Sequence, residues 1–331
     1  MSGINCNPLD DRLLYEIYGD YETILPSSGI GREKFIGILD FIKRHISKEE
    51  KIVEIGCGDG YLLKILRDFG YKHTYCIEPS KALSQIAEKH GVRVFNQFFT
   101  SETNLDIDID VFILVHVLEH FKDPVSIIEK CLTLGRKIVI EVPYLCGHLH
   151  EHMFFFSVSS FQEICKLVSA KILEYEIDNY FNNYPVLRLI ISKDGGLKDD
   201  ANKKETYEEV LSCLHREKLN TQSQVERLIS ILESGGSYLL WGSGSSAIIV
   251  LNLIRDKLLE LTKKQVCKIL LTDSDKSRHG KFIPGIGIEV TPYESLIGIK
   301  FSGVIILSQF YREIEELARR IGLTFERIYV I

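Results

Sequence analysis

The sequence has little of what would place the protein in a membrane, outside the cell or on nucleic acid. It contains no apolar run near the ~20 residues of a membrane-spanning helix, and residues 1–20 do not form a secretory signal. It has no long basic block, and its net charge of -6 is a poor match for a nucleic-acid surface. We therefore expect a cytoplasmic protein with no membrane or nucleic-acid partner, acting on a small molecule.

Paired cysteines are also missing. The cysteines are scattered along the chain without any C-x-x-C pair. This pattern favours small apolar fillers in a reducing compartment over disulfides or zinc ligands, so we expect no structural metal. The cysteines are Cys6, Cys57, Cys76, Cys131, Cys146, Cys165, Cys213 and Cys267.

A glycine-rich turn follows a buried-strand pattern at residues 53–55. The turn is Gly56-x-Gly58-x-Gly60, and a helical pattern follows at residues 62–69. Glycines let the backbone approach a ligand closely, and the N–H groups at the start of a helix point back at it. Glu78 ends the next apolar run, at the distance expected of an acid that binds a ribose. The pattern predicts a nucleoside cofactor.

The acids around this turn indicate which nucleoside binds. A dinucleotide site favours G-x-G-x-x-G, and Glu54 and Asp59 would repel a pyrophosphate. Both acids suit the sulfonium and amino groups of S-adenosyl-L-methionine, and the turn resembles motif I of class I methyltransferases. A plain structural turn is the alternative interpretation. With this resemblance, the expected cofactor-binding residues are Glu54, Gly56, Gly58, Asp59, Gly60, Glu78, Pro79, Phe98 and His116.

Strand and helix patterns alternate through the first half of the chain. A helical stretch to about residue 90 precedes strands at residues 92–95 and 111–118, a helix at 125–134 and a strand at 137–142. Residues 119–124 resemble the loop after the fourth strand of these methyltransferases, where the methyl donor meets the acceptor. The predicted fold class is α/β, a class I methyltransferase (Rossmann-like) domain.

The second half has an organisation of its own. After a strand at residues 186–192 the composition becomes polar, and helical spacing follows at residues 206–233. A second strand and glycine turn at residues 238–246 predicts a smaller Rossmann-like α/β domain. We expect an N-terminal helical lid segment at residues 1–45, the cofactor-binding methyltransferase domain at 46–193, a helical linker at 194–235 and a substrate domain at 236–331.

Several further motifs share one resemblance. They are Ser27-Ser28, Ile77-Glu78-Pro79, Phe98-Phe99, Glu141-Val142-Pro143-Tyr144, His150-Glu151-His152, Asp273-Ser274-Asp275-Lys276 and residues 279–285. From Tyr18 almost to the C-terminus, the chain is similar to the sugar C-methyltransferases that act on nucleotide-linked 4-keto-6-deoxy sugars. The resemblance implies a part in deoxysugar or polysaccharide biosynthesis.

The chain departs from that family in two places. Members typically begin with a small zinc domain that carries cysteine pairs, and only Cys6 lies ahead of the glycine turn. The family's tyrosine before the His-Glu-His run is replaced by Leu149. Because both changes concern substrate recognition, an O- or N-methyltransferase acting on a related sugar is the alternative. A partner protein, a smaller substrate or residues 9–45 acting as a lid would replace the zinc domain. A nicotinamide-dependent oxidoreductase is a third hypothesis.

Methyl transfer to carbon requires a base, because carbon is a poor nucleophile until a proton beside a carbonyl is removed. Histidine suits this task, with an unperturbed pKa of ~6.5. We predict His152 as the base, with Glu151 or His150 orienting it, and His116 and His120 as secondary candidates. In O-methyltransferases, such residues shape a lid instead. The expected substrate-binding residues are Tyr144, Arg188, Lys276 and Lys281. For the three cations among them, ordinary surface charge is the alternative interpretation.

Overall fold

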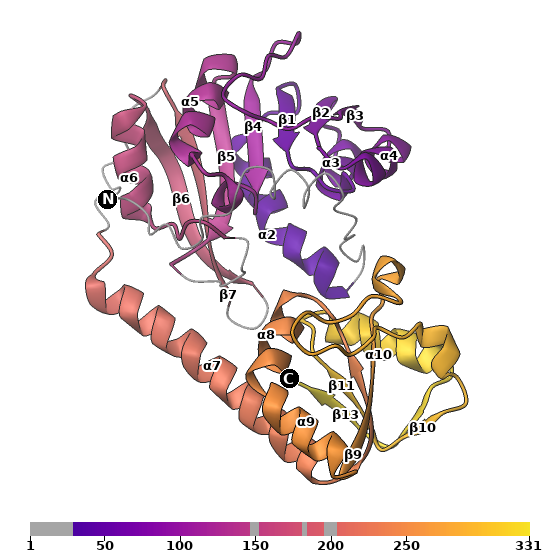
Figure 1. The fold of residues 1–331 in the computed structure, drawn as a ribbon. Coiled ribbons are helices and arrows are strands. Elements are labelled where there is room, and N and C mark those ends of the chain that lie inside the picture. The colour runs from indigo at the N-terminus through magenta and orange to yellow at the C-terminus, as the bar shows by residue number, and fades with distance from the viewer. Residues whose placement is uncertain (1–28, 146–151, 181–183, 195–203) are drawn as a thin grey trace. The chain divides into compact units, whose positions relative to one another are not determined.

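The structure is a computed structural model that describes residues 29–145, 152–180, 184–194 and 204–331 (Figure 1). The chain divides into two compact units, and the main boundary falls between residues 213 and 214. This boundary lies inside one long helix, α7 (Tyr207–Glu233). Within the part of the chain that the structure describes, no helix is long and apolar enough to cross a membrane.

A seven-stranded sheet forms the centre of the first unit, with the strand order β3-β2-β1-β4-β5-β7-β6. The strands β3, β2, β1, β4 and β5 run parallel, whereas β7 is antiparallel to both β5 and β6. In chain order the strands are β1 (Lys51–Ile55), β2 (His73–Ile77), β3 (Arg93–Phe95), β4 (Val111–Val115), β5 (Lys137–Pro143), β6 (Lys171–Tyr180) and β7 (Tyr184–Ser192).

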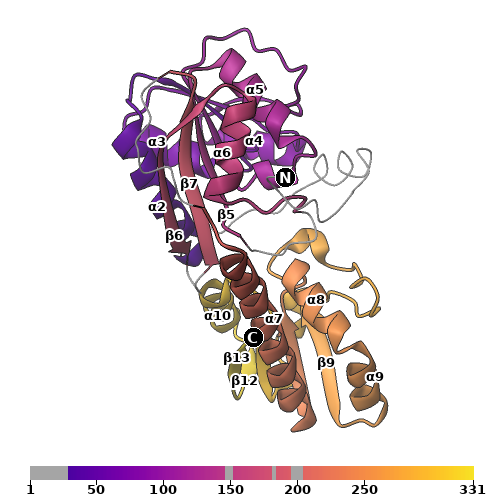
Figure 2. The same ribbon diagram turned by 90° about the vertical axis from the view of Figure 1, so that its left-hand side faces the viewer.

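Helices cover both faces of this sheet, because the central strands are apolar on both sides. Alternate residues of β4 show the division: Val111 and Ile113 pack in one core, and Phe112 and Leu114 pack in the other. The first core contains α2 (Gly29–His45), α3 (Tyr61–Asp68) and α4 (Lys81–Lys89). The second contains α5 (Pro124–Leu134) and α6 (Val158–Leu167). Figure 2 shows α2 and α3 on one side of β6 and β7, with α5 and α6 on the other.

The described part of the expected lid segment is helix α2. Phe35, Ile38, Phe41 and Ile42 are buried in the first core together with Ile52 of β1. Residues 33–45 therefore form part of the core of the first unit. The rest of the predicted lid, residues 1–28, lies outside the described residues.

The second unit has a four-stranded parallel sheet of its own, in the order β13-β11-β8-β9. Its strands are β8 (Gly236–Trp241), β9 (Cys267–Thr272), β11 (Gly303–Ile306) and β13 (Ile328–Val330), and a small pair is formed by β10 (Lys300–Phe301) and β12 (Thr324–Phe325). Helices α8 (Ser245–Leu253), α9 (Arg255–Lys263) and α10 (Tyr311–Arg320) pack against the larger sheet. The predicted smaller α/β domain is confirmed.

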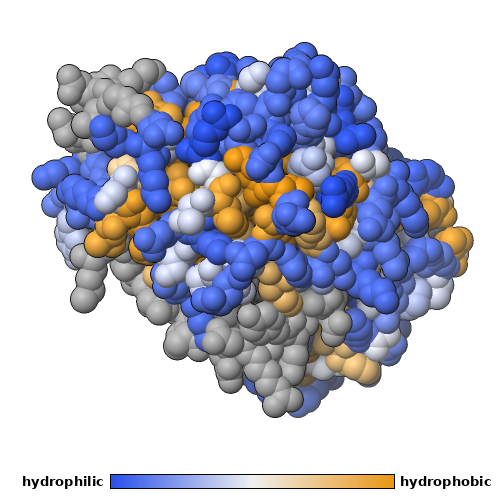
Figure 3. Space-filling view, turned by 90° about the horizontal axis from the view of Figure 1, so that it is seen from above, coloured by the Kyte–Doolittle hydropathy of each residue, from blue (hydrophilic) through white to orange (hydrophobic). Residues whose placement is uncertain are grey.

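The surface seen from above is mainly hydrophilic, with a band of apolar residues across it (Figure 3). Scattered apolar side chains are exposed elsewhere, such as Phe69 and Leu167 in the first unit and Leu253 in the second. Single exposed apolar residues are normal on folded proteins and need no functional explanation.

Candidate functional site

The glycine turn lies at the end of β1, where the backbone needs left-handed conformations. Gly56 has a φ of 68° and Gly58 a φ of 56°, a region that residues with a Cβ enter only with strain. An added Cβ at Gly56 would lie 2.7 Å from Val117 Cγ2, in the loop after β4. At Gly58, no described atom lies within 4 Å of an added Cβ. The turn is therefore tight against the protein at Gly56 and open beside Gly58.

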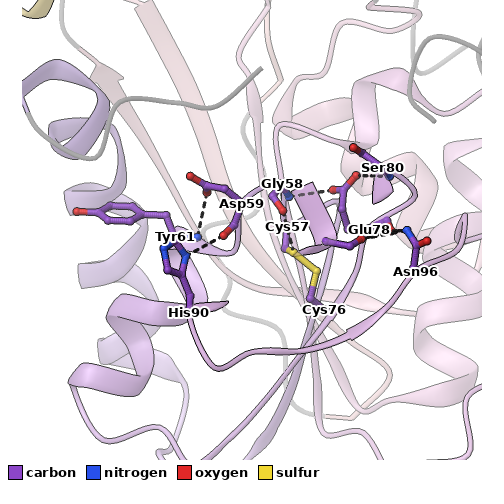
Figure 4. Close-up of a disulfide and its surroundings, with 10 residues drawn as sticks. Cys57, Gly58, Asp59, Tyr61, Cys76, Glu78, Ser80, His90 and Asn96 are labelled. Atoms are coloured by element: carbon purple, nitrogen blue, oxygen red, sulfur yellow. Dashed lines mark hydrogen bonds between the residues drawn. A yellow bond between two sulfur atoms is a disulfide. The ribbon is translucent and has the colours of Figure 1, made fainter. Parts of the chain in front are cut away.

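Glu78 follows β2 and reaches across to this turn (Figure 4). Its two carboxylate oxygens accept hydrogen bonds from the backbone N–H groups of Gly58, at 2.9 Å, and Ser80, at 2.8 Å. Its side chain is 5% exposed. Burial raises the pKa of Glu78 to about 7, against the lowering effect of the two hydrogen bonds. The backbone carbonyls of Glu78 and Pro79 each accept a hydrogen bond from the Asn96 amide.

Two further acids, Glu54 and Asp59, lie at the turn. Glu54, on β1, is 4% exposed, and its Oε2 makes no hydrogen bond with any described residue. Burial raises the pKa of Glu54 well above its usual value, and the nearby Asp59 and Glu78 raise it further. Burial also raises the pKa of Asp59. A cationic ligand would stabilise the ionised form of these groups, so the turn fits a positively charged nucleoside better than a pyrophosphate.

Of the other residues predicted to bind the cofactor, Gly60 has a φ of 74° and precedes helix α3. Pro79, which follows Glu78, is half-buried, and so is Phe98, two residues after Asn96. His116 lies directly after β4, in contact range of the acids described below. These positions agree with the predicted cradle, and their part in binding stays a prediction.

The expectation that the cysteines are unpaired was wrong for Cys57, Cys76 and Cys213, each of which lies in a disulfide. Cys57, between Gly56 and Gly58, forms a disulfide with Cys76 of β2 (Figure 4). The parallel pairing of β1 with β2 places Glu54 opposite Cys76, which brings the glycine turn next to the end of β2. This disulfide could not be predicted from the sequence, because the two cysteines are separated by 19 positions and do not form a recognised pair.

Replacing both Cys57 and Cys76 by serine should lower the free energy of unfolding by about 3 kcal/mol. A cross-link across a loop of this length removes chain entropy from the unfolded state. Urea denaturation followed by circular dichroism measures the change. Dithiothreitol should lower the unfolding midpoint of the parent protein by more than that of the double variant, which keeps only the disulfide of Cys213. A parent midpoint that does not respond to reductant would contradict the prediction.

A cluster of histidines and carboxylates lies at the same edge of the sheet, after β4. The predicted strand at residues 111–118 ends early, at Val115, because His116 adopts a left-handed conformation with a φ of 52°. The chain then forms the short helix η1 (Leu118–His120). His116 Nδ1 lies 3.4 Å from Glu119 Oε1, and its Nε2 lies 3.3 Å from Glu141 Oε1 on β5.

His152, the predicted base, joins this cluster from a distant part of the chain. It is 4% exposed, and the backbone N–H of Met153 donates to the Glu119 carbonyl at 2.8 Å. His152 Nε2 lies 3.9 Å from Glu119 Oε1, and its ring meets that of His120 edge-on at 4.9 Å. Its predicted helpers, His150 and Glu151, lie outside the described residues.

Glu119 is the centre of the cluster and was not among the predicted site residues. It is 0% exposed. Burial alone would raise its pKa, but the surrounding histidines outweigh burial and lower the pKa of Glu119 to about 2. Glu141, also 0% exposed, is the second acid that was missed. Glu119 follows β4, and Glu141 lies near the end of the neighbouring parallel strand β5. The carboxyl ends of such strands meet at one edge of a sheet.

Arg188, which we predicted to bind substrate, is occupied inside the protein. It is 1% exposed on β7 and forms ion pairs with Glu141, Glu176 and Asp178. Through Glu141 it connects to His116 and so to the histidine cluster. In this structure Arg188 is therefore positioned to hold Glu141, and its predicted contact with substrate would require it to leave these partners.

The remaining predicted substrate residues also have partners. Tyr144 donates a hydrogen bond to Glu205 Oε1 at 3.0 Å, and Glu205 accepts further bonds from the backbone at the start of α6. Lys276, in the second unit, pairs with Glu294 at 2.6 Å and has a side chain that is 68% exposed. Lys281, in the same unit, is exposed. Their roles toward a substrate stay predictions.

Comparison with known proteins finds similarities over part of the chain. Residues 31–175 match the model of a protein family described as a methyltransferase domain. A Methanocaldococcus jannaschii protein described as uncharacterized is 29% identical over 178 residues, which are 52% of this chain and 82% of that protein. A ubiquinone biosynthesis O-methyltransferase of Stutzerimonas stutzeri is 31% identical over 104 residues, 29% of this chain and 44% of that enzyme. The chain thus spans less than half of that relative.

Solved structures resemble about half of the chain. Magnesium protoporphyrin IX methyltransferase from Synechocystis PCC 6803, with bound S-adenosylmethionine, is 12% identical with a TM-score of 0.45, and the likeness covers 57% of this chain and 100% of that one. A possible histamine N-methyltransferase from Thermotoga maritima is 18% identical with a TM-score of 0.39, and the likeness covers 49% of this chain and 90% of that one.

Proposed function

We propose a substrate class and a chemistry for this protein, which is a methyltransferase with S-adenosyl-L-methionine as its cofactor. The proposed reaction is the transfer of a methyl group to a carbon beside the ketone of a nucleotide-linked 4-keto-deoxysugar. The proposed biological setting is deoxysugar or polysaccharide biosynthesis in the cytoplasm. The observation that carries the chemistry is the buried cluster of imidazoles and carboxylates after β4 and before α6.

The glycine turn supplies the cofactor site in this proposal. S-adenosylmethionine, when bound, provides an electrophilic methyl group on a sulfonium. Glu78 directly follows β2, where an acid can accept hydrogen bonds from ribose hydroxyls. Burial raises the pKa of Glu54 and of Asp59, and the positive charge of a bound sulfonium and amino group would favour their ionised forms.

The cluster supplies the acid–base chemistry. A carbon acceptor becomes nucleophilic only after a base removes a proton beside the ketone, and such proton transfer contributes about 10²- to 10⁴-fold to a rate. His152 is our first candidate for that base, held by the bond between Met153 and Glu119. Val117 in the loop after β4 touches Gly56 of the turn, so the cluster and the cofactor turn are neighbours. Positioning two bound reactants can be worth about 7–11 kcal/mol of the barrier.

The alternative function is O- or N-methylation of a related sugar or another small molecule. It is favoured by the similarity to ubiquinone biosynthesis O-methyltransferases, which extends over 104 residues at 31% identity. Such a reaction deprotonates a hydroxyl or uses an amine directly, so it would not exchange a carbon-bound proton with water.

Product analysis separates these functions. We would incubate the protein with S-adenosylmethionine and a panel of nucleotide-linked 4-keto and 4-hydroxy deoxysugars, and locate the new methyl group by mass spectrometry and NMR. The proposal expects a C-methyl product from a 4-keto sugar. An O- or N-methyl product would reject it in favour of the alternative.

The affinity for the cofactor should fall as the pH falls through about 7, the pKa of Glu78. Below this value the carboxyl is protonated and loses an acceptor for the ribose hydroxyls, so the dissociation constant should rise up to about tenfold per pH unit. Calorimetric titration with S-adenosylhomocysteine between pH 6 and 8 measures it. Glu78→Gln, which cannot titrate, should bind more weakly with a flatter pH dependence. A pH dependence identical in parent and variant would contradict this role of Glu78.

A further inference from the structure

Three side chains of the histidine cluster bring metal-binding atoms together. Glu119, His120 and His152 each offer one such atom, and the three atoms lie within 4.8 Å of one another. Two of the residues come from η1, and the third precedes α6 by several residues. We predicted no structural metal from the cysteine pattern, but a set of two imidazoles and one carboxylate is a different group of ligands.

Glu119 is the strongest sign of a missing partner. Its side chain is 0% exposed, and neither carboxylate oxygen accepts a hydrogen bond from the described residues. The nearest imidazole atoms are His116 Nδ1 at 3.4 Å and His152 Nε2 at 3.9 Å. Burying a carboxylate is costly unless it is hydrogen-bonded, paired with a charge or bound to a metal. The arrangement thus leaves acceptor capacity inside the protein.

The backbone holds these donors in place. Met153 N–H donates to the Glu119 carbonyl at 2.8 Å, and His120 N–H donates to the Val117 carbonyl at 3.1 Å. The rings of His120 and His152 meet edge-on with centroids 4.9 Å apart. Ligands fixed by such contacts lose little freedom when they bind an ion, which favours metal binding.

We propose that Glu119, His120 and His152 bind a divalent cation of the zinc type. Two histidines and one glutamate are the protein ligands of known catalytic zinc sites, which leave a further position open for water or substrate. Ligand atoms about 2.0–2.2 Å from zinc lie roughly 3.4 Å apart in a tetrahedral site. The three atoms here, all within 4.8 Å, therefore need only a small contraction to reach this geometry.

A bound cation would also take part in the proposed methylation, and this part of the inference rests on the proposed function. At the open position it would hold the keto oxygen of the acceptor and stabilise the negative charge of the enolate. His152, when bound to the cation, could not also take up the substrate proton, so in this arrangement His116 would be the base. His116 lies outside the ligand set, between Glu119 and Glu141. Metal binding itself does not depend on which acceptor is methylated.

Zinc binding to the full-length protein tests the site directly. The chain is dialysed against a chelator, freed of it and titrated with zinc chloride by calorimetry, and the bound metal is counted by mass spectrometry. We expect about one tightly bound zinc per chain. Glu119→Gln and His120→Ala should each weaken it by at least about 100-fold, because even the loss of outer-shell contacts costs 10–100-fold. Circular dichroism confirms that each variant is folded.

His73→Gln is the matched control, because His73 is exposed on β2 away from the cluster. It should bind zinc as tightly as the parent. A parent chain without a stoichiometric site, or a Glu119→Gln variant that binds zinc as tightly as the parent, would overturn the proposal. If the zinc-free chain methylated a keto sugar at the full rate, the proposed metal site would be rejected and the proposed substrate class would be kept. Stoichiometric zinc binding without any such methylation would support the site and reject only the substrate.

Discussion

Replacing His152 by glutamine should lower kcat for methyl transfer by about 10²- to 10⁴-fold, the range over which a positioned proton-transfer group contributes. The side chain is buried in the cluster and lies 3.9 Å from Glu119, and a glutamine amide at this position cannot take up a proton at neutral pH. Binding of S-adenosylhomocysteine should stay within about twofold of the parent value, because the glycine turn is unchanged.

Steady-state kinetics with the methylated substrate and calorimetry with S-adenosylhomocysteine separate the two effects. The same substitution at the exposed His73 provides the control, with kcat expected to match the parent. If His152→Gln kept most of the parent rate, the role of His152 would be structural. O- or N-methylation, which needs no base to remove a carbon-bound proton, would then be favoured.

Replacing Arg188 by methionine should lower the free energy of unfolding by about 3–5 kcal/mol. Arg188 is 1% exposed, and its removal leaves the buried Glu141 without the cation that faces it. Breaking a buried ion pair on one side is costly because the other charge remains unpaired in a low-dielectric surrounding. Urea unfolding followed by circular dichroism measures the loss.

Two variants show whether the unpaired charge is the cause. The double variant Arg188→Met with Glu141→Leu should recover much of the lost stability, since apolar replacement of a buried pair is often neutral. Arg136→Met removes an exposed ion pair with Asp110 and should cost no more than about 1 kcal/mol. An Arg188→Met loss as small as that of Arg136→Met would contradict the account of a buried ion network.

The parts of the fold with strong local signals could be predicted from the sequence. The run before Glu78 forms β2 (His73–Ile77) as expected, and the glycine turn does join β1 to a helix. Strand β6 was missed although Tyr175 and Ile177 alternate with acids, because an irregularity between Ile172 and Glu174 breaks the alternation. Helix α9 was missed because it follows α8 after only Ile254, without a turn signal.

The candidate site was harder to predict because it depends on contacts between distant residues. His152 was identified, but its neighbour Glu119 was not, and the two meet only because the segment before α6 returns to η1. The ion pairs of Arg188 could not be predicted, because a lone cation in a sequence does not show its partners. Its burial against Glu141 follows from the antiparallel pairing of β5 with β7, which places these two residues opposite each other.

Exchange of carbon-bound hydrogen with solvent tests the central claim most directly. The protein would be incubated in deuterated water with a nucleotide-linked 4-keto-deoxysugar and S-adenosylhomocysteine, so that no methyl group can be transferred. The account predicts that deuterium enters the position beside the ketone with the parent protein, and that His152→Gln loses this exchange. Absence of exchange with the parent protein, for a sugar that it methylates, would contradict the enolate mechanism.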